Sequence, residues 1–172
     1  MAAIYTRLAQ MSDLPAIMKI IADAKEFLKV AGSTQWQSGY PNEATIQHDI
    51  LAQVGYCLLC GEEVVGYAAV IVGPDPNYHK IAGAWNNDQD PYATIHRIAM
   101  SNKYQGQHLA GKFVSNLISL YYARNLRNFR VDTGLKNQPM QALAKSQGFV
   151  KRGIVRVDDP LDPDRVGLEL NL

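Results

Sequence analysis

The segment from Tyr92 to Arg124 constrains the fold most, because it reads as a strand, a turn and a helix in succession. The apolar run 93–100 predicts a buried strand, and the polar residues 101–104 predict a turn after it. The stretch 105–112 then opens a helical pattern that continues to about Arg124. The free N–H groups and the positive dipole end of such a helix N-terminus form a binding site for a phosphate anion.

The common phosphate loops do not fit this turn. Gly106, Gly111 and Lys112 have P-loop spacing, but Phe113 stands where a P-loop has its magnesium-binding hydroxyl. A dinucleotide fingerprint needs three glycines, and only two are present. The turn instead resembles the acyl-CoA pyrophosphate loop of the GNAT superfamily of N-acetyltransferases, Gln/Arg-x-x-Gly-x-Gly/Ala. Gln105 and Ala110 take its ends, and His108 replaces the middle glycine.

A second motif supports this resemblance. Residues 128–134 predict a strand that ends in glycine, and Asn137, Met140 and the pair Gly148-Phe149 follow it. This order is similar to the fifth strand, the next helix and the Gly-Phe turn of the same superfamily. The resemblance implies that acetyl-CoA is the cosubstrate. It also implies an N-acetyltransferase that moves the acetyl group to the primary amine of a small molecule by direct attack on the thioester.

The hydrophobic patterning predicts an α/β (α+β) fold over one domain, residues 1–172. The resemblance implies the acyl-CoA N-acyltransferase fold, a mixed, mostly antiparallel central sheet of about seven strands with helices on both faces. The expected strands are 4–10, 54–60, 63–72, 93–100, 128–134, 149–157 and 165–171. The expected helices are 12–28, 42–52, 106–124 and 137–146.

The composition predicts a cytoplasmic protein with neither a nucleic-acid nor a membrane partner. The net charge is +1, which is unlike a nucleic-acid-binding polyelectrolyte. No apolar run approaches the roughly 20 residues that span a membrane, and the N-terminus lacks a signal-peptide pattern. Cys57 and Cys60 lie three apart on an expected strand, so they face opposite sides and predict no metal site. The oligomeric state is open, and a homodimer is compatible with the sequence.

The resemblance also assigns cosubstrate-binding residues. A bulge in the strand 93–100 would leave the backbone of Ile98, Ala99 and Met100 free to hold the thioester and the pantetheine arm. Asn137 would bind that arm and also cap the following helix. Lys112 could reach a phosphate or could be an ordinary solvated lysine. The residues expected around the pyrophosphate are Gln105, Gly106, Gln107, His108, Leu109, Ala110, Gly111 and Lys112.

His96 is the first candidate for the base that deprotonates the amine. Imidazole titrates near neutrality, and strand alternation predicts that His96 and Ile98 share a face. The stretch 96–100 is similar to the His-x-Leu-x-Val pattern of serotonin N-acetyltransferases, which use a histidine in proton removal. The alternative is a histidine satisfied within the sheet. Asp132 is the second candidate base, unless it pairs with a neighbouring arginine.

The general acid is where the chain departs from the superfamily. Many members have a tyrosine where this chain has Ala144. Ser146 could replace it, or the thiolate could leave unassisted toward the helix dipole.

Two loops rich in aromatic residues, 31–41 and 73–91, are the expected acceptor pocket. Trp36, Tyr40, Tyr78 and Trp85 are its candidate walls, although each ring could simply fill a gap beneath its loop. Two other functions stay open. An open groove would favour a protein acetyltransferase acting on N-termini or lysines. Binding without turnover would favour a catalytically weak acyl-CoA sensor.

Overall fold

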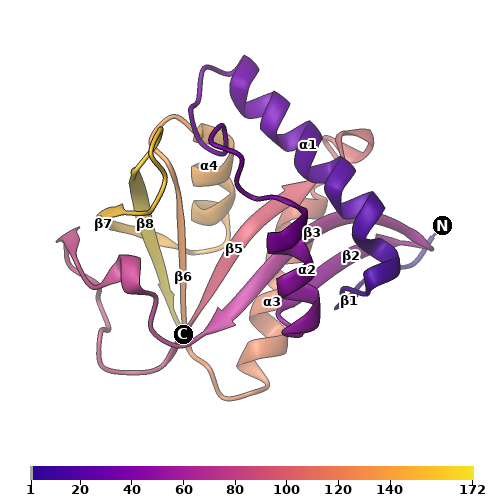
Figure 1. Cartoon of the computed structure of the whole chain (residues 1–172). Helices are drawn as coiled ribbons and strands as arrows, with labels where there is room; N and C mark the ends of the chain where they lie inside the picture. The colour runs from indigo at the N-terminus through magenta and orange to yellow at the C-terminus, as the bar shows by residue number, and fades with distance from the viewer. Residues whose placement is uncertain (1) are drawn as a thin grey trace.

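The fold is one eight-stranded sheet with helices on both faces, described for residues 2–172 by a computed structural model (Figure 1). The strands lie in the order β1-β2-β3-β5-β6-β8-β7-β4. The strands are β1 (Ile4–Leu8), β2 (Gly55–Cys60), β3 (Glu63–Val72), β4 (Ile81–Gly83), β5 (Tyr92–Met100), β6 (Asn128–Gly134), β7 (Val150–Arg156) and β8 (Asp164–Asn171). The helices are α1 (Leu14–Val30), α2 (Glu43–Leu51), α3 (Leu109–Tyr122) and α4 (Gln138–Ser146). Short 3-10 turns lie at Met11–Asp13, Pro76–Tyr78 and Asn102–Tyr104.

The contact between β5 and β6 decides where a site can form. These two strands are the parallel pair of an otherwise antiparallel sheet. They pair only where Tyr92–Thr94 lies beside Asn128–Arg130. Beyond that point the strands diverge, as Figure 1 shows. Backbone groups on the facing edges therefore lose their strand partners, and a gap opens in the centre of the sheet.

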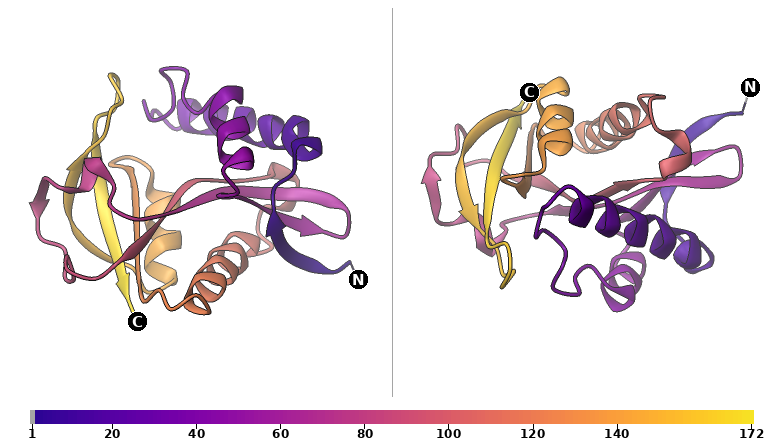
Figure 2. Two further views of the ribbon diagram at one scale, coloured as in Figure 1. Left: turned by 60° about the horizontal axis from the view of Figure 1, so that its bottom comes forward. Right: turned by 90° about the horizontal axis from the view of Figure 1, so that it is seen from above.

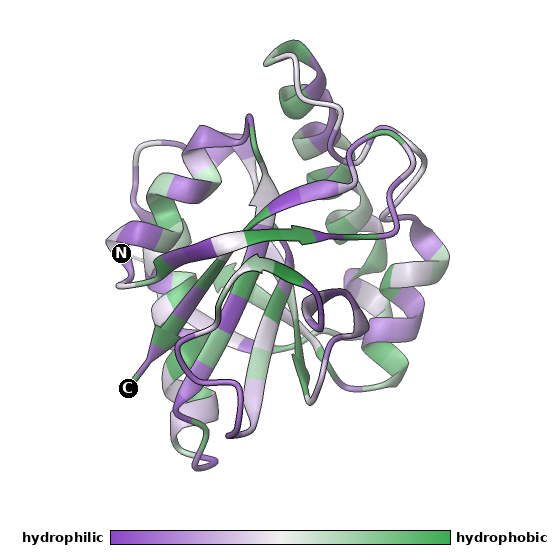
Figure 3. Cartoon of the chain, turned by 90° about the vertical axis from the view of Figure 1, so that its left-hand side faces the viewer, coloured by the Kyte–Doolittle hydropathy of each residue, from purple (hydrophilic) through white to green (hydrophobic). Residues whose placement is uncertain are grey.

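The two faces of the sheet carry separate cores. Helices α1 and α2 cover one face, and α3 and α4 cover the other (Figure 2). On α1 the buried Ile17, Ile20, Ile21 and Leu28 follow the helical period, which explains why this helix lies flat on the sheet. Figure 3, coloured by hydropathy, shows apolar stretches along the strands and hydrophilic residues in many of the connecting loops. Within residues 2–172, no helix is long and apolar enough to cross a membrane.

The predicted fold class is confirmed, with one strand more than expected. The extra strand, β4, lies in the segment that was expected to be irregular, and it pairs with β7. Gly83 lies directly opposite Gly153, and a Cβ on either residue would come within 2.2 Å of a backbone oxygen across the pair. A three-residue strand held by this close approach has no hydrophobic period for a sequence to reveal. Helix α3 also begins later than predicted, at Leu109 rather than at Gly106.

Candidate active site

A cavity of about 710 Å³ passes through the gap between β5 and β6. Its wall includes Phe27 and Leu28 from α1 on one face, and Met140 and Leu143 from α4 on the other. Because these helices cover opposite faces, the cavity reaches both sides of the sheet. Two molecules could therefore enter from opposite faces and meet at the strand edges.

A β-bulge at Arg97 and Ile98 shapes the centre of this cavity. In the pairing of β3 with β5, Ala69 lies opposite His96 and Tyr67 lies opposite Ala99, so β5 has one extra residue. The bulge overturns the expectation that His96 and Ile98 share a face. Ile95 and Ile98 both pack in the core under α3 and α4, although unbroken alternation would separate them. His96 therefore faces α1 and α2, and Ile98 faces α3 and α4.

The side of the cavity under α3 and α4 contains the expected strand residues. Ile98, Ala99 and Met100 all lie in its wall, on the β5 edge that β6 no longer pairs. Their free backbone groups can bind an extended amide-containing chain as a strand would. Gln105 and Ala110 extend this wall to the start of α3.

The turn before α3 has the amide groups that a phosphate needs. The N–H groups of Gly106, His108, Leu109, Ala110 and Gly111 donate to no acceptor within residues 2–172. Gly106 has φ +78°, and a Cβ there would meet nothing within 4 Å, so the turn is open on that side. These observations fit a pyrophosphate at this helix N-terminus. Gln107 is exposed, whereas the Leu109 side chain is buried in the core and contributes only backbone.

His108 has an unusual conformation for its residue type. It has φ 55° and ψ 22°, the left-handed region where the superfamily's glycine would cost little. Outside glycine this region costs roughly 1–2 kcal/mol, although histidine tolerates it better than most residues. Lys112 lies outside the main cavity, beside a shallow hollow that Ser115 and Asn116 also line.

Asn137 caps α4 and is anchored from the other side of the sheet. Its Oδ1 accepts the N–H of Met140 at 3.2 Å, and its Nδ2 donates to Gln35 Oε1 at 3.1 Å. The same Gln35 oxygen accepts the N–H of Gly134 at 3.1 Å. Gln35 therefore ties the loop after α1 to the end of β6. Sequence reasoning missed Gln35, because its partners lie about a hundred positions away.

His96 forms a dyad with Asp75, a residue that sequence reasoning also missed. Nε2 of His96 lies 3.3 Å from Asp75 Oδ2, and both side chains are largely buried in the cavity wall. Burial raises the pKa of Asp75, but the contacts with His96 and the Asn77 N–H outweigh it and lower the pKa overall. With Nε2 facing a carboxylate, the neutral imidazole has its free lone pair on Nδ1. That atom has no hydrogen-bond partner within residues 2–172.

Asp132 lies in the same wall, but its oxygens are already engaged. Oδ2 accepts the Tyr78 hydroxyl at 2.6 Å, and Oδ1 lies 3.8 Å from Arg165 Nε. Burial raises the pKa of Tyr78 well above its ordinary value, and Asp132 raises it further, so this phenol stays a neutral donor. Its position makes Asp132 better suited to attract a cation than to take a proton.

Of the four candidate acceptor aromatics, two lie in the cavity wall. Trp36 and Tyr40 line it from the loop after α1. Trp36 has φ 64°, a costly conformation for so bulky a residue, so its surroundings must hold the ring there. Burial raises the pKa of Tyr40 despite the opposing effect of Arg97, so its hydroxyl is neutral at pH 7.

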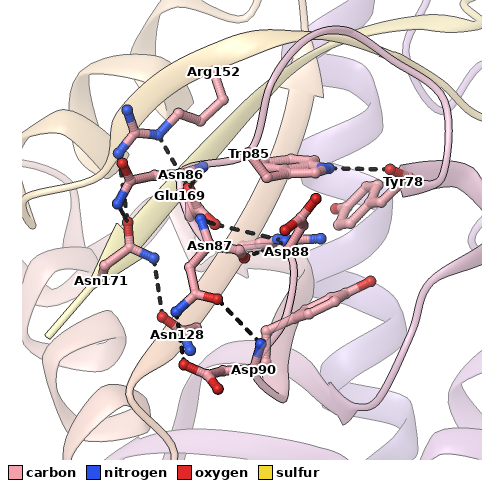
Figure 4. Close-up of polar contacts among 12 residues, drawn as sticks. Tyr78, Trp85, Asn86, Asn87, Asp88, Asp90, Asn128, Arg152, Glu169 and Asn171 are labelled. Atoms are coloured by element: carbon pink, nitrogen blue, oxygen red, sulfur yellow. Dashed lines mark hydrogen bonds and ion pairs between the residues drawn. The ribbon is translucent and has the colours of Figure 1, made fainter.

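Tyr78 and Trp85 lie outside the cavity wall. The Trp85 indole donates to the Tyr78 carbonyl at 3.0 Å, and the two rings pack 5.3 Å apart (Figure 4). The Arg130 guanidinium stacks 4.1 Å from the Trp85 ring. Trp85 therefore packs beneath its loop, and Tyr78 reaches the cavity only through Asp132. The sequence shows that these rings sit in a loop but not which way they point.

No side chain in the expected place can act as the general acid. Ala144 is buried in the core, and the Ser146 hydroxyl donates to the Leu143 carbonyl at 2.7 Å. Helix α4 contributes Pro139, Met140 and Leu143 to the cavity wall, and none of these titrates. A departing thiolate would therefore meet apolar side chains and the positive end of α3.

The α1 side of the cavity is acidic. Asp75, Asp132, Asp158 and Asp159 line it, against Arg97 and Arg165. Arg97 is already paired with Asp49, and Arg165 is shared among three carboxylates. Asp158 is exposed and forms no ion pair within residues 2–172. Negative charge therefore exceeds positive charge where an amine would enter.

The order of these features along the chain identifies the family. The sequence matches the acetyltransferase (GNAT) family over residues 16–149. The chain belongs to the GNAT acetyltransferase family. This enzyme family uses acetyl-CoA as its acetyl donor. No curated protein is similar enough to the chain to count as a match.

Solved structures agree with this assignment. A GNAT-family acetyltransferase from Streptococcus agalactiae is 35% identical, with a TM-score of 0.89 over 98% of this chain and 95% of that one. A GNAT-family acetyltransferase from Listeria monocytogenes shares the fold at 18% identity, with a TM-score of 0.74 over 100% and 98% of the two chains. A ribosomal L7/L12 α-N-protein acetyltransferase in complex with coenzyme A shares it at 19% identity, with a TM-score of 0.71 over 98% and 94%.

Proposed function

We propose that this GNAT acetyltransferase acetylates the primary amine of a small cationic molecule, in the cytoplasm. The observation that carries the proposal is the cavity through the sheet, with a cosubstrate side under α3 and α4 and an acidic, aromatic side under α1. A cavity of about 710 Å³ suits small-molecule ligands, which also favours a small acceptor over a protein chain.

The cosubstrate side is assigned to acetyl-CoA, which supplies an activated acyl thioester when bound. The free N–H groups of 106 and 108–111 would hold its pyrophosphate. The unpaired edge of β5 at Ile98–Met100, together with Asn137, would orient its pantetheine arm. The acetyl group would then lie in the gap between β5 and β6, within reach of the other face.

On the acceptor side, His96 is the proposed base. Its Nδ1 would take a proton from the incoming ammonium, directly or through a water, because only the neutral amine attacks a carbonyl. Asp75 would orient the ring and stabilise the imidazolium that forms. Asp132 would attract the cation rather than serve as the base, since Tyr78 already occupies one of its oxygens.

The acidic wall predicts which small amines are acetylated fastest. Putrescine, n-butylamine and γ-aminobutyrate share a four-carbon amine and differ at the far end, which is cationic, neutral or anionic. We expect kcat/KM to fall in that order, by at least about tenfold from first to last, because the carboxylates attract one far end and repel the other. Coenzyme A release measured at low and high salt checks this, and high salt should narrow the differences.

The same assay includes peptides with free N-termini. Turnover of peptides alone would replace the small-amine proposal with the protein-acetyltransferase alternative. Coenzyme A binding with no turnover of any amine would favour the sensor. A preference for γ-aminobutyrate would contradict the charge argument while leaving the small-amine function intact.

Replacing Gly106 by proline tests the assigned anion site. Proline cannot adopt φ +78° and has no N–H, so the turn would lose both its shape and a donor. We expect calorimetry to show coenzyme A affinity lowered at least about tenfold, or about 1.4 kcal/mol.

His108→Gly is the matched control for this experiment, because it keeps the amide and suits the left-handed conformation. Its affinity should stay within about twofold of the wild type. A folded Gly106→Pro variant with unchanged affinity would place the pyrophosphate elsewhere.

A further inference from the structure

Arg97 occupies the bulge of β5, between His96 and Ile98, with φ 58°. Glycine would adopt this left-handed conformation more easily. The arginine instead extends a long side chain out of the sheet toward α2. Its neighbours on either side are the proposed base and the first residue of the proposed thioester surface, so the bulge sets how these two lie relative to each other.

The Arg97 side chain is fixed by a buried forked contact with Asp49 of α2. Nε donates to Asp49 Oδ2 at 2.9 Å, and Nη2 donates to Oδ1 at 2.7 Å. The two side chains are only 9% and 3% exposed. The Tyr67 hydroxyl also donates to Asp49 Oδ2, at 2.7 Å. Two parallel hydrogen bonds fix the orientation of a guanidinium, which a single ammonium contact cannot do.

A third contact connects this ion pair to the acceptor side of the cavity. Arg97 Nη1 donates to the hydroxyl oxygen of Tyr40, which lines the cavity from the loop after α1. The same guanidinium lies 5.9 Å from the centre of the Tyr40 ring. Arg97 thus lies in the bulge and contacts both helix α2 and the acceptor wall.

We infer that Arg97 is a positioning residue. Its forked pair with Asp49 fixes the bulge so that His96 and the Ile98–Met100 edge both face the gap. Its hydrogen bond to Tyr40 places the acceptor wall against them. The inference rests on the proposed function. It assigns Arg97 no contact with either substrate.

Arg97→Lys tests the inference, because it keeps a cation beside the buried Asp49 carboxylate. The lysine keeps the charge but cannot form the fork. We expect kcat at saturating substrates to fall about tenfold or more, while KM for acetyl-CoA stays within about twofold, because the pyrophosphate turn is untouched. Tyr40→Phe should instead raise KM for the amine several-fold and change kcat by less than about twofold.

The matched control is Arg7→Lys. Arg7 also forms a forked pair, through Nη1 and Nη2 with Asp13 at 2.7 and 2.9 Å, on the edge strand β1 and outside the cavity wall. Its substitution should lower the thermal midpoint and leave kcat unchanged. Wild-type kcat and KM in Arg97→Lys would overturn the inference. The inference would also be overturned if kcat fell in both Arg97→Lys and Arg7→Lys only in proportion to the fraction of folded protein.

A second readout separates this inference from the proposed function. If the wild type turns over no amine, the proposed function fails. The effect of Arg97 on the position of the His96 ring is then measured by NMR. The His96 C2–H signal should shift in Arg97→Lys and stay in place in Arg7→Lys. An unshifted signal in Arg97→Lys would overturn the inference whether or not the enzyme is active.

Discussion

Replacing His96 by alanine should lower kcat by about 100-fold or more, which corresponds to about 2.7 kcal/mol of transition-state stabilisation. Coenzyme A affinity should be unchanged, because the anion-binding turn is on the other face of the sheet. Coenzyme A release measures kcat, and calorimetry measures the affinity.

The Asp75→Asn variant tests the role of the Asp75 charge in the same assay. The pKa of Asp75 lies below its usual range, because the contacts with His96 and Asn77 outweigh burial. Its carboxylate is therefore ionised throughout a neutral assay and can stabilise a positive charge on the ring. Asparagine keeps the shape but loses the charge that faces His96, so kcat should fall, but by less than in His96→Ala. Full activity of His96→Ala at pH 7 would exclude His96 as the base and make Asp132 the next candidate.

Replacing Glu169 by glutamine should lower the free energy of unfolding by about 3 kcal/mol or more. This carboxylate is fully buried, with Arg152 Nε at 3.1 Å and the Asn86 N–H at 2.7 Å (Figure 4). Arg130 Nη2 lies 3.6 Å from its other oxygen. Glutamine has nearly the same shape, but it leaves two guanidiniums without their shared countercharge. Urea unfolding monitored by circular dichroism measures the loss.

Asp164→Asn is the control for Glu169→Gln. Asp164 also pairs with an arginine, Arg156 at 3.8 Å, but both side chains are more than half exposed. Removing this charge should change the free energy of unfolding by less than about 1 kcal/mol. If the two substitutions lowered the free energy of unfolding equally, the buried Glu169 network would not stabilise the protein as its geometry indicates.

Local physical chemistry explains what could be predicted from the sequence. The succession of strand, turn and helix at 92–124 is a pattern between near neighbours, as are the helical period of α1 and the Asn137 cap. These patterns, with the two motifs and their order, led to the correct fold class and family. They also indicated where an anion could bind, since helix N-termini have free amides whatever the rest of the fold.

Only the tertiary structure decided how the α1 side of the cavity is built. Asp75 reaches His96 from 21 positions away, Gln35 reaches Asn137 across 102, and Arg97 reaches Asp49 across 48. Such contacts depend on which strands become neighbours, and no local period encodes them. The face of His96 was mispredicted for a related reason. Alternation holds only in a regular strand, and the bulge at Arg97, visible only as a shift in pairing with β3, reverses it.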